Sequence, residues 1–486
     1  MIAAGAQDVS ERPPQQGRPA DGGRRLLLIT YHFPPSREVG SLRWGQFAKL
    51  AAEGGWSLDV ITLDPAWLPA ADGPSPQLPA GVRVHGIPDP PLLLDRLVRA
   101  LLAIRRRLLA ARSNEAPPAS PSASASARPS SLGVEELRSP FHSWRDAVRA
   151  FHAWRADVRF HTWSRRAAAV ARRLLRASRY RAVVTCGPPH VVHVAGVDLR
   201  RRMGIPLIVD MRDPWSLAPR MQEEIASPLA LAIARRRERR TVEAAALVVA
   251  NTEPSRRAMQ AAYPGARDKI IAILNGYDDE PVPPSEHDAC FIIGYAGSIY
   301  LDRDPRPLFR AVACAVRDLA LRPERLRLEF MGLNAIQAAR LEQVAREEGT
   351  AGFVRFHPPH SRSEAQRFLA RAAMLVSLPL VSLSLERDTS IPAKLFEYAR
   401  FEAWLLALAN PGSATADALR GTGADVVPPH DAEAIAAVIK RRYSAYASGA
   451  RPERTRLPAH FSRRAQARLL FEEIERRLPV AQDPES

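Results

Sequence analysis

The residue types best suited to chemistry gather around Lys394, about a hundred residues before the C-terminus. Thr389 or Ser390 can cap the start of a helix there, and Pro392 fits a first helical turn. Lys394 and Glu397 are three residues apart and so share one face of that helix. A helix start beside a lysine suits a phosphate, and a carboxylate one turn on can accept the hydroxyls of a ribose. The stretch therefore suits a nucleoside diphosphate, although an ordinary amphipathic surface helix with a Lys/Glu pair would look the same.

Other unusual residues directly follow short apolar runs that are typical of buried strands. They are, in chain order, Gly40, Arg43, His190, Asp213, Gly297, Ser298 and Arg303. Ligands of open α/β sheets bind beyond the carboxyl ends of the strands, which is where these residues fall. Turn chemistry accounts for any one of these loops. A loop-capping role for His190 and a helix N-cap role for Asp213 remain equally open.

The apolar runs themselves predict an α/β protein with two doubly wound, Rossmann-like domains that face a central cleft. One series of runs alternates with helical patterns in residues 24–281 and a second does so in 286–455. Such unbroken apolar runs are typical of parallel strands covered on both faces. A proline-rich linker joins the domains. Residues 1–23 are predicted to be a disordered tail, and 456–480 a helix that crosses back to the N-terminal domain.

An insertion at about residues 91–170 interrupts the first domain. Residues 113–133 are rich in Ala, Ser and Pro, and an arginine-rich helical stripe precedes them. Trp144, Trp154 and Trp163 follow among further arginines. A basic amphipathic helix with interfacial tryptophans suits an anionic membrane surface, and a helix packed on its own domain is the equal alternative.

Composition narrows the function classes further. The formal net charge of +17 attracts nucleic acid, anionic lipid or phosphorylated substrates. The basic residues are dispersed and form no recognised nucleic-acid module, so we expect no nucleic-acid partner. The three cysteines are far apart and form no metal site by themselves. Without an apolar leader or a membrane-spanning run, we expect a cytoplasmic protein, or one peripheral on the inner membrane face.

The motifs, taken in order, resemble those of GT-B glycosyltransferases of the large retaining family 4, in the branch of bacterial cell-surface polysaccharide enzymes. The matching phrases cover nearly all of the chain from Arg24 to Leu478. They are residues 30–35 with 40–43, 187–190, 210–215, 274–278, 295–300 and 391–398. The resemblance implies transfer of a sugar from a nucleotide-diphosphate sugar, bound by the second domain, to a glycan or polyprenyl-linked acceptor held by the first.

The same resemblance implies roles for individual residues. Glu397 would hold the ribose, while Arg303 and Lys394 would neutralise the diphosphate. Gly297 and Ser298 would allow its close approach, and Gly40 would close over it from the first domain. His190 and Asp213 would face the transferred sugar or the acceptor, and one of them would handle the acceptor proton. No metal and no other cofactor is expected, since fixed cations can stabilise the leaving diphosphate.

One departure from the family pattern leaves other function classes open. Many members have a second glutamate eight positions before the residue that matches Glu397, and here that position is Thr389. A non-catalytic scaffold or binding protein with the same fold is therefore an alternative. A nucleotide-sugar 2-epimerase is another, although its acidic and histidine signatures are not evident.

Overall fold

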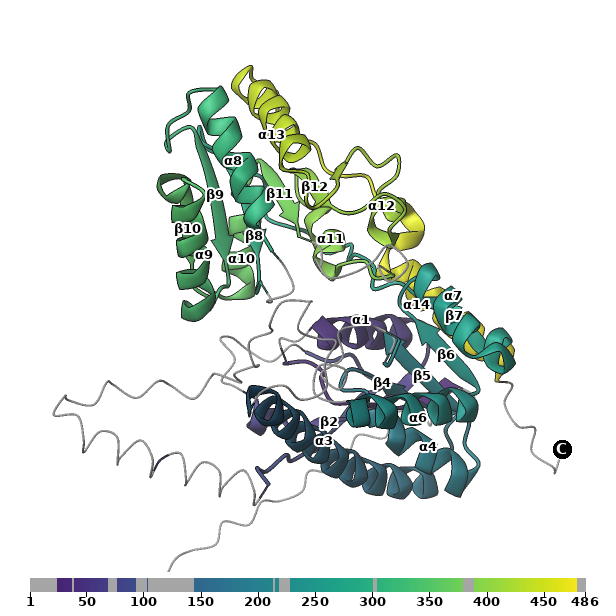
Figure 1. The fold of residues 1–486 in the computed structure, drawn as a ribbon. Helices are drawn as coiled ribbons and strands as arrows, with labels where there is room; N and C mark the ends of the chain where they lie inside the picture. Colours follow the sequence, from purple (N-terminus) through teal and green to yellow (C-terminus); the bar gives the residue numbers. More distant parts are fainter. Residues whose placement is uncertain are drawn as a thin grey trace, which may run out of the picture.

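The computed structural model describes residues 24–36, 39–68, 77–92, 103, 144–212, 215–217, 228–299, 304–378 and 389–478. Two parallel sheets with helices on both faces make up two domains, one above the other in Figure 1. The predicted fold class is confirmed.

The N-terminal domain is built on a parallel sheet of seven strands in the order β3-β2-β1-β4-β5-β6-β7. The strands are β1 (Arg25–Thr30), β2 (Ser57–Leu63), β3 (Val82–Ile87), β4 (Ala182–Cys186), β5 (Leu207–Arg212), β6 (Leu247–Ala250) and β7 (Ile270–Ala272). Its helices are α1 (Val39–Glu53), α3 (Trp144–Ala177), α4 (Val192–Met203), α6 (Pro228–Ala244) and α7 (Glu253–Ala262). The order reverses between β1 and β4, which is where a doubly wound sheet opens a binding crevice.

The C-terminal domain repeats this plan with six parallel strands in the order β10-β9-β8-β11-β12-β13. The strands are β8 (Phe291–Ala296), β9 (Leu326–Met331), β10 (Val354–His357), β11 (Met374–Ser377), β12 (Trp404–Leu408) and β13 (Asp425–Val427). Its helices are α8 (Arg306–Asp318), α9 (Ala335–Glu347), α10 (Arg362–Arg371), α11 (Ala393–Tyr398), α12 (Ala414–Ala418) and α13 (Ala432–Ala447). The corresponding reversal lies between β8 and β11.

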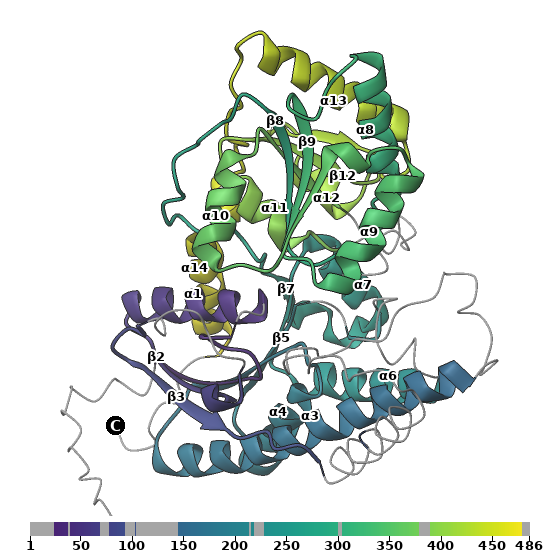
Figure 2. The same cartoon turned by 90° about the vertical axis from the view of Figure 1, so that its left-hand side faces the viewer.

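Each sheet has a hydrophobic core on both faces. In the N-terminal domain, α3, α4 and α6 cover one face, and α1 covers the other. The last helix, α14 (Arg463–Arg477), belongs to this second core although it follows the C-terminal domain in sequence. Figure 2 shows α14 beside α1. Leu470 and Ile474 are buried there, at 1% and 0% exposure.

The strand β3 was missed by the sequence analysis. It pairs with β2 along the edge of the sheet, and only Ile87 in it is buried. Polar residues such as Arg83 and His85 alternate with its valines, so it lacks the continuous apolar run that revealed the other strands.

The predicted insertion falls partly outside the described residues. These omit 93–102 and 104–143, and with them most of the arginine-rich stripe and the Ala/Ser/Pro-rich stretch. Residues 144–177 are a long helix of the domain itself. Trp163 is not an interfacial residue, because its side chain is fully buried and its indole N–H donates to the backbone oxygen of Ile87 over 3.3 Å. Trp154, by contrast, is 54% exposed.

The linker and the last helix fasten the two domains. Arg463 forms an ion pair with Asp278, and Arg400 donates to the backbone oxygen of Glu280. A hydrogen bond also crosses between the domains, from the hydroxyl of Thr252 to the backbone oxygen of Thr389. The position that departs from the family pattern therefore contacts the other domain through its backbone.

Candidate active site

Two glycines bring the backbone close together at the carboxyl end of β8. Gly297 and Gly332 have φ angles of +108° and +92°, which side chains with a Cβ rarely adopt. A Cβ on Gly332 would lie 3.2 Å from the Cα of Gly297. A Cβ on Gly297 would lie 2.6 Å from the Nζ of Lys394. Glycine at 297 therefore leaves room for the lysine to lie directly against this turn.

The ammonium group of Lys394 is held in place by Tyr295. Nζ donates to the phenolic oxygen over 2.7 Å and lies 4.0 Å from the centroid of the ring. The hydroxyl of Tyr295 in turn donates to the backbone oxygen of Ser298 over 3.0 Å. A positive charge is thus fixed beside a bare backbone turn, an arrangement that suits a phosphate group. Lys394, Gly297 and Ser298 were predicted from the sequence as site residues, whereas Tyr295 was not given a role.

Helix α11 begins later than the predicted cap at Thr389 or Ser390 and is therefore short. Its N-cap is Pro392, and neither Thr389 nor Ser390 caps it through a side chain. The helix is tied to β8 by the hydroxyl of Tyr398, which accepts from the N–H of Ala296 over 2.8 Å and donates to its carbonyl over 3.1 Å. With only six residues, α11 contributes little of the helix-dipole stabilisation that the sequence suggested.

Glu397 lies one turn beyond Lys394 on α11 and is half-buried. Its carboxylate makes no hydrogen bond or ion pair with any residue in the described ranges. Four predicted donor-binding residues therefore lie at the end of β8 and on α11: Gly297, Ser298, Lys394 and Glu397. In Figure 1, α11 lies at the end of its domain that faces α1.

The predicted residues of the N-terminal domain lie at the carboxyl ends of β1 and β4. His190 is 6% exposed and stacks on Trp215, with ring centroids 5.6 Å apart and planes at 19°. Its Nδ1 is 3.5 Å from Nε2 of His193, whose Nδ1 is 2.9 Å from the hydroxyl of Thr185. A Cβ on Gly187 would lie 2.6 Å from Nδ1 of His190, so glycine there lets the two rings approach.

Burial disfavours the charged form of both imidazoles of this pair. Burial, the neighbouring His193 and the charge of Arg212 hold the pKa of His190 well below its usual value of 6.5. Burial lowers the pKa of His193 to about 3, against an opposing effect of Asp210. Because its pKa is so low, His190 is a weak base and is better suited to hydrogen bonding than to taking up a proton.

Gly40 lies in the first turn of α1, in contact with Arg212. A Cβ on Gly40 would lie 2.4 Å from Nη1 of that arginine. Arg43, one turn further along, is buried in the protein rather than presented to a ligand. Its guanidinium binds Asp210, with Nε 3.0 Å from Oδ2, and donates to the backbone oxygens of Ile273 and Leu274. Asp213 and Arg303, the two remaining predicted site residues, lie outside the described residues.

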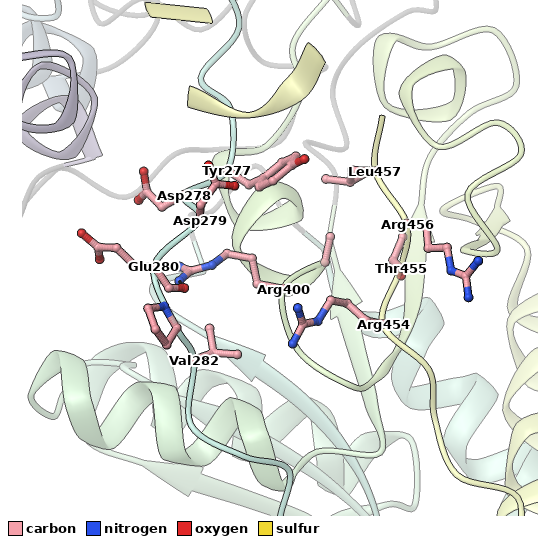
Figure 3. A pocket seen from close by; sticks show the side chains of 12 residues that line it. Tyr277, Asp278, Asp279, Glu280, Val282, Arg400, Arg454, Thr455, Arg456 and Leu457 are labelled. Carbon is pink, nitrogen blue, oxygen red and sulfur yellow. Dashed lines mark hydrogen bonds between the residues drawn. The ribbon is translucent and has the colours of Figure 1, made fainter. Parts of the chain in front are cut away.

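A pocket of about 520 Å³ lies beside the linker rather than at these sites (Figure 3). Asp278, Glu280 and Arg400 line one side, and Arg454 and Arg456 come from the segment that leads to α14. None of the predicted site residues that the structure describes lines it. Its acidic and basic side chains occur together, which gives no preference for one charge of ligand.

No three His, Cys, Asp or Glu side chains within the described ranges converge as metal ligands would. Among the helices placed by the structure, none combines the length and apolar character needed to cross a membrane.

The chain is similar to glycosyltransferases in sequence and in fold. Residues 116–276 match the model of the glycosyl transferase 4-like domain. The D-inositol 3-phosphate glycosyltransferase of Nocardiopsis dassonvillei is 31% identical over 202 residues, which are 37% of this chain and 46% of the relative. The chain thus spans less than half the length of this curated relative.

Solved structures extend the likeness to both domains. The sucrose-phosphate synthase of Thermosynechococcus elongatus superimposes with a TM-score of 0.55 at 16% identity, over 94% of this chain and 100% of that one. The lipopolysaccharide outer core galactosyltransferase WaaB superimposes with a TM-score of 0.51 at 12% identity, over 93% and 100%. At such low identity the likeness concerns the fold alone.

The two facing Rossmann-like domains define the class as GT-B. Within this fold, residues 116–276 are similar to a glycosyl transferase 4-like domain, in agreement with the resemblance of the motifs.

Proposed function

We propose that this protein transfers a sugar from a nucleotide-diphosphate sugar to a glycan or lipid-linked acceptor. The observation that carries the proposal is the lysine held at a glycine turn, with Lys394 Nζ 2.7 Å from the hydroxyl of Tyr295 and pressed against Gly297. Glu397 lies one turn away on α11, and its carboxylate makes no hydrogen bond or ion pair with the described residues, so it is available to a ribose. The family 4-like domain and the inositol phosphate glycosyltransferase relative support the same activity.

In the proposed reaction, the bond between the anomeric carbon and the diphosphate oxygen breaks, and an acceptor oxygen takes its place. Lys394 and the backbone N–H groups near Gly297 stabilise the charge that develops on the departing nucleoside diphosphate. Arg303 adds a second cation. We assign His190 to hydrogen bonding with the sugar, because its low pKa makes it a weak base. Asp213 is then the better candidate to receive the acceptor proton.

Several finer features belong to the proposal as well. Retention of configuration, independence of metal ions and a role in envelope polysaccharide synthesis follow from the resemblance to family 4. The similar proteins are a D-inositol 3-phosphate glycosyltransferase and a lipopolysaccharide outer core galactosyltransferase, so they do not indicate one common acceptor. We further propose that the enzyme works in the cytoplasm at an anionic inner membrane surface, where the exposed Trp154 would contribute.

One observation favours a second function, that of a non-catalytic binding protein. Thr389 replaces an acidic residue of the family pattern, and its backbone joins the two domains through Thr252. A scaffold would retain the fold without needing Lys394 or Glu397. Replacing either residue by alanine would then leave the cellular function intact.

A thermal-shift screen separates the two functions. The purified protein would be melted with UDP, GDP, ADP, dTDP and CMP, and the Lys394→Ala variant would be the control. A ligand at about 100 times its dissociation constant adds roughly 2.7 kcal/mol of stability, which is readily visible. We expect one nucleoside diphosphate to raise the melting temperature, and the variant to lose that rise. No rise with any of them would favour the scaffold.

A further inference from the structure

Arg212 has an unusual backbone and an unusual environment. It is the last residue of β5, where the pairing with β6 shifts register, and its φ is +56°. Left-handed backbone is strained for a residue with a side chain, and such strain gathers at functional sites. The shift in register turns the side chain toward α1, where its guanidinium lies against Gly40. Only 8% of the residue is exposed.

The described residues supply no counter-charge to Arg212. Nη1 is 3.4 Å from the backbone oxygen of Gly187, which is a weak contact, and Nε is buried without a hydrogen-bond partner. In the described part of the chain no carboxylate forms an ion pair with it. Arg43 shows the contrast, since its buried guanidinium is neutralised by Asp210. A buried, uncompensated guanidinium is costly, so the site is incomplete without an anion.

The start of α1 increases this need for an anion. The helix has 15 residues, and the N–H groups of its first turn carry a positive partial charge. Gly40 belongs to that turn, and the absence of a Cβ there brings the guanidinium into contact with it. The guanidinium of Arg212 and the positive N-terminal end of α1 are therefore in contact in the protein interior. An anion bound by both would relieve their repulsion, and a phosphate matches both the donor fork of arginine and the helix terminus.

We propose that Arg212 and the first turn of α1 at Gly40 bind a phosphate group in the N-terminal domain. The place of this site in the reaction rests on the proposed function. The phosphate comes either from the diphosphate of the donor, when the domains close on it, or from a phosphorylated acceptor.

Melting in inorganic phosphate tests the site without any nucleotide. Wild-type protein and variants would be melted in phosphate and in chloride at equal ionic strength. We expect phosphate to raise the melting temperature of the wild type and not that of Arg212→Gly. In chloride, Arg212→Gly should melt no lower than the wild type, because glycine adopts this φ without strain and the buried charge is gone. The matched control is Arg172→Gln, which removes a half-buried arginine of the same domain and should keep the phosphate effect.

The proposal is overturned if phosphate stabilises Arg212→Gly as much as the wild type, or if it stabilises neither. Should Arg212→Gly not fold, Arg212→Asn takes its place with the same expected loss, because asparagine tolerates left-handed backbone.

Nucleotide titrations then distinguish the two sources of the phosphate. If it is the donor diphosphate, Arg212→Gly weakens the binding of the nucleoside diphosphate found in the screen at least 10-fold. The affinity for the unphosphorylated nucleoside stays the same. If it belongs to the acceptor, the affinity for the nucleotide stays the same. Phosphate then still stabilises the nucleotide-saturated wild type but not the saturated variant. Absence of all nucleotide binding in the wild type would defeat the proposed function, while the phosphate melts would still decide whether Arg212 is an anion site.

Discussion

Lys394 and Tyr295 form one unit across two elements of the C-terminal domain, with Nζ 2.7 Å from the phenolic oxygen and 4.0 Å from the ring centroid. Tyr295 is fully buried in β8, so the lysine on α11 is held by a rigid partner. The tyrosine hydroxyl in turn donates a hydrogen bond to the backbone oxygen of Ser298. The position of the ammonium group therefore depends on a residue that would not itself touch the ligand.

Removing either member of this unit should weaken nucleotide binding to different extents. Lys394→Ala loses a charge-assisted hydrogen bond of about 1.5–3 kcal/mol, a weakening of about 10- to 100-fold. Tyr295→Phe keeps the ring but removes the hydrogen bond to the ammonium group, and should weaken binding by about 1 kcal/mol, or roughly 5-fold. Isothermal titration with the nucleoside diphosphate found in the screen measures both. Equal affinity in wild type and Lys394→Ala would contradict a donor site here.

Much of the C-terminal half of this site was predictable from sequence, and the reason is its local chemistry. Gly297, Lys394 and Glu397 directly follow strands or share one short helix, so their spacing indicates their neighbourhood. The contacts of Arg43 with Asp210 were not predictable, because the two residues are separated by 167 positions and meet only in the folded protein. The strain of Arg212 was equally invisible, since backbone φ follows from the register shift in β5.

The buried histidine pair should make the protein sensitive to acid. The pKa of His190 lies well below 6.5 in the folded state, and that of His193 is lowered to about 3. The unfolded chain keeps the ordinary value near 6.5, so below that pH it binds protons that the folded chain does not. The free energy of unfolding therefore falls as the pH drops from about 7 toward 4. Urea denaturation across this range measures the slope.

The matching variant for this prediction is His193→Gln. It removes one of the two buried imidazoles and should flatten the dependence on pH, whereas His430→Gln, at an exposed turn, should retain the wild-type slope. A slope unchanged by His193→Gln would show that His193 is not the source.

Asp210 should be among the most important polar residues for stability. Its carboxylate accepts hydrogen bonds from Nε of Arg43 over 3.0 Å and from the indole N–H of Trp44 over 2.8 Å. All three side chains are buried. Asp210→Ala leaves the charge of Arg43 buried and unpaired, which should cost about 3–5 kcal/mol. Glu475→Gln is the control, because the exposed pair of Glu475 with Arg24 should contribute less than about 1 kcal/mol. Chemical denaturation measures the free energy of unfolding of both variants. A similar decrease in the two would contradict the prediction.

Membrane attachment can be tested at Trp154 and in the basic segment before it. Trp154 is 54% exposed on α3, and Phe151 beside it is 38% exposed. Trp154→Ala, and deletion of residues 91–133, should weaken binding to vesicles that contain anionic lipid. Trp67→Ala is a matched control, since Trp67 is 43% exposed at a different place on the same domain. Vesicle sedimentation at low and high salt measures the effect, and full binding by the deletion variant would exclude this mode of attachment.

Neighbouring leucines on α14 test whether the last helix stabilises the N-terminal domain. Leu470 is 1% exposed in the core that α1 shares with the sheet, while Leu469 is 41% exposed. Leu470→Ala should lower the free energy of unfolding by about 2–5 kcal/mol, because it opens a cavity in a packed core. Leu469→Ala should cost much less, because its side chain is largely in solvent already. Hydrogen exchange would locate the loss: we expect faster exchange in α1 and β1 of the Leu470→Ala variant, while α13 in the other domain stays protected. Equal effects of the two substitutions would mean that α14 does not dock on this core in solution.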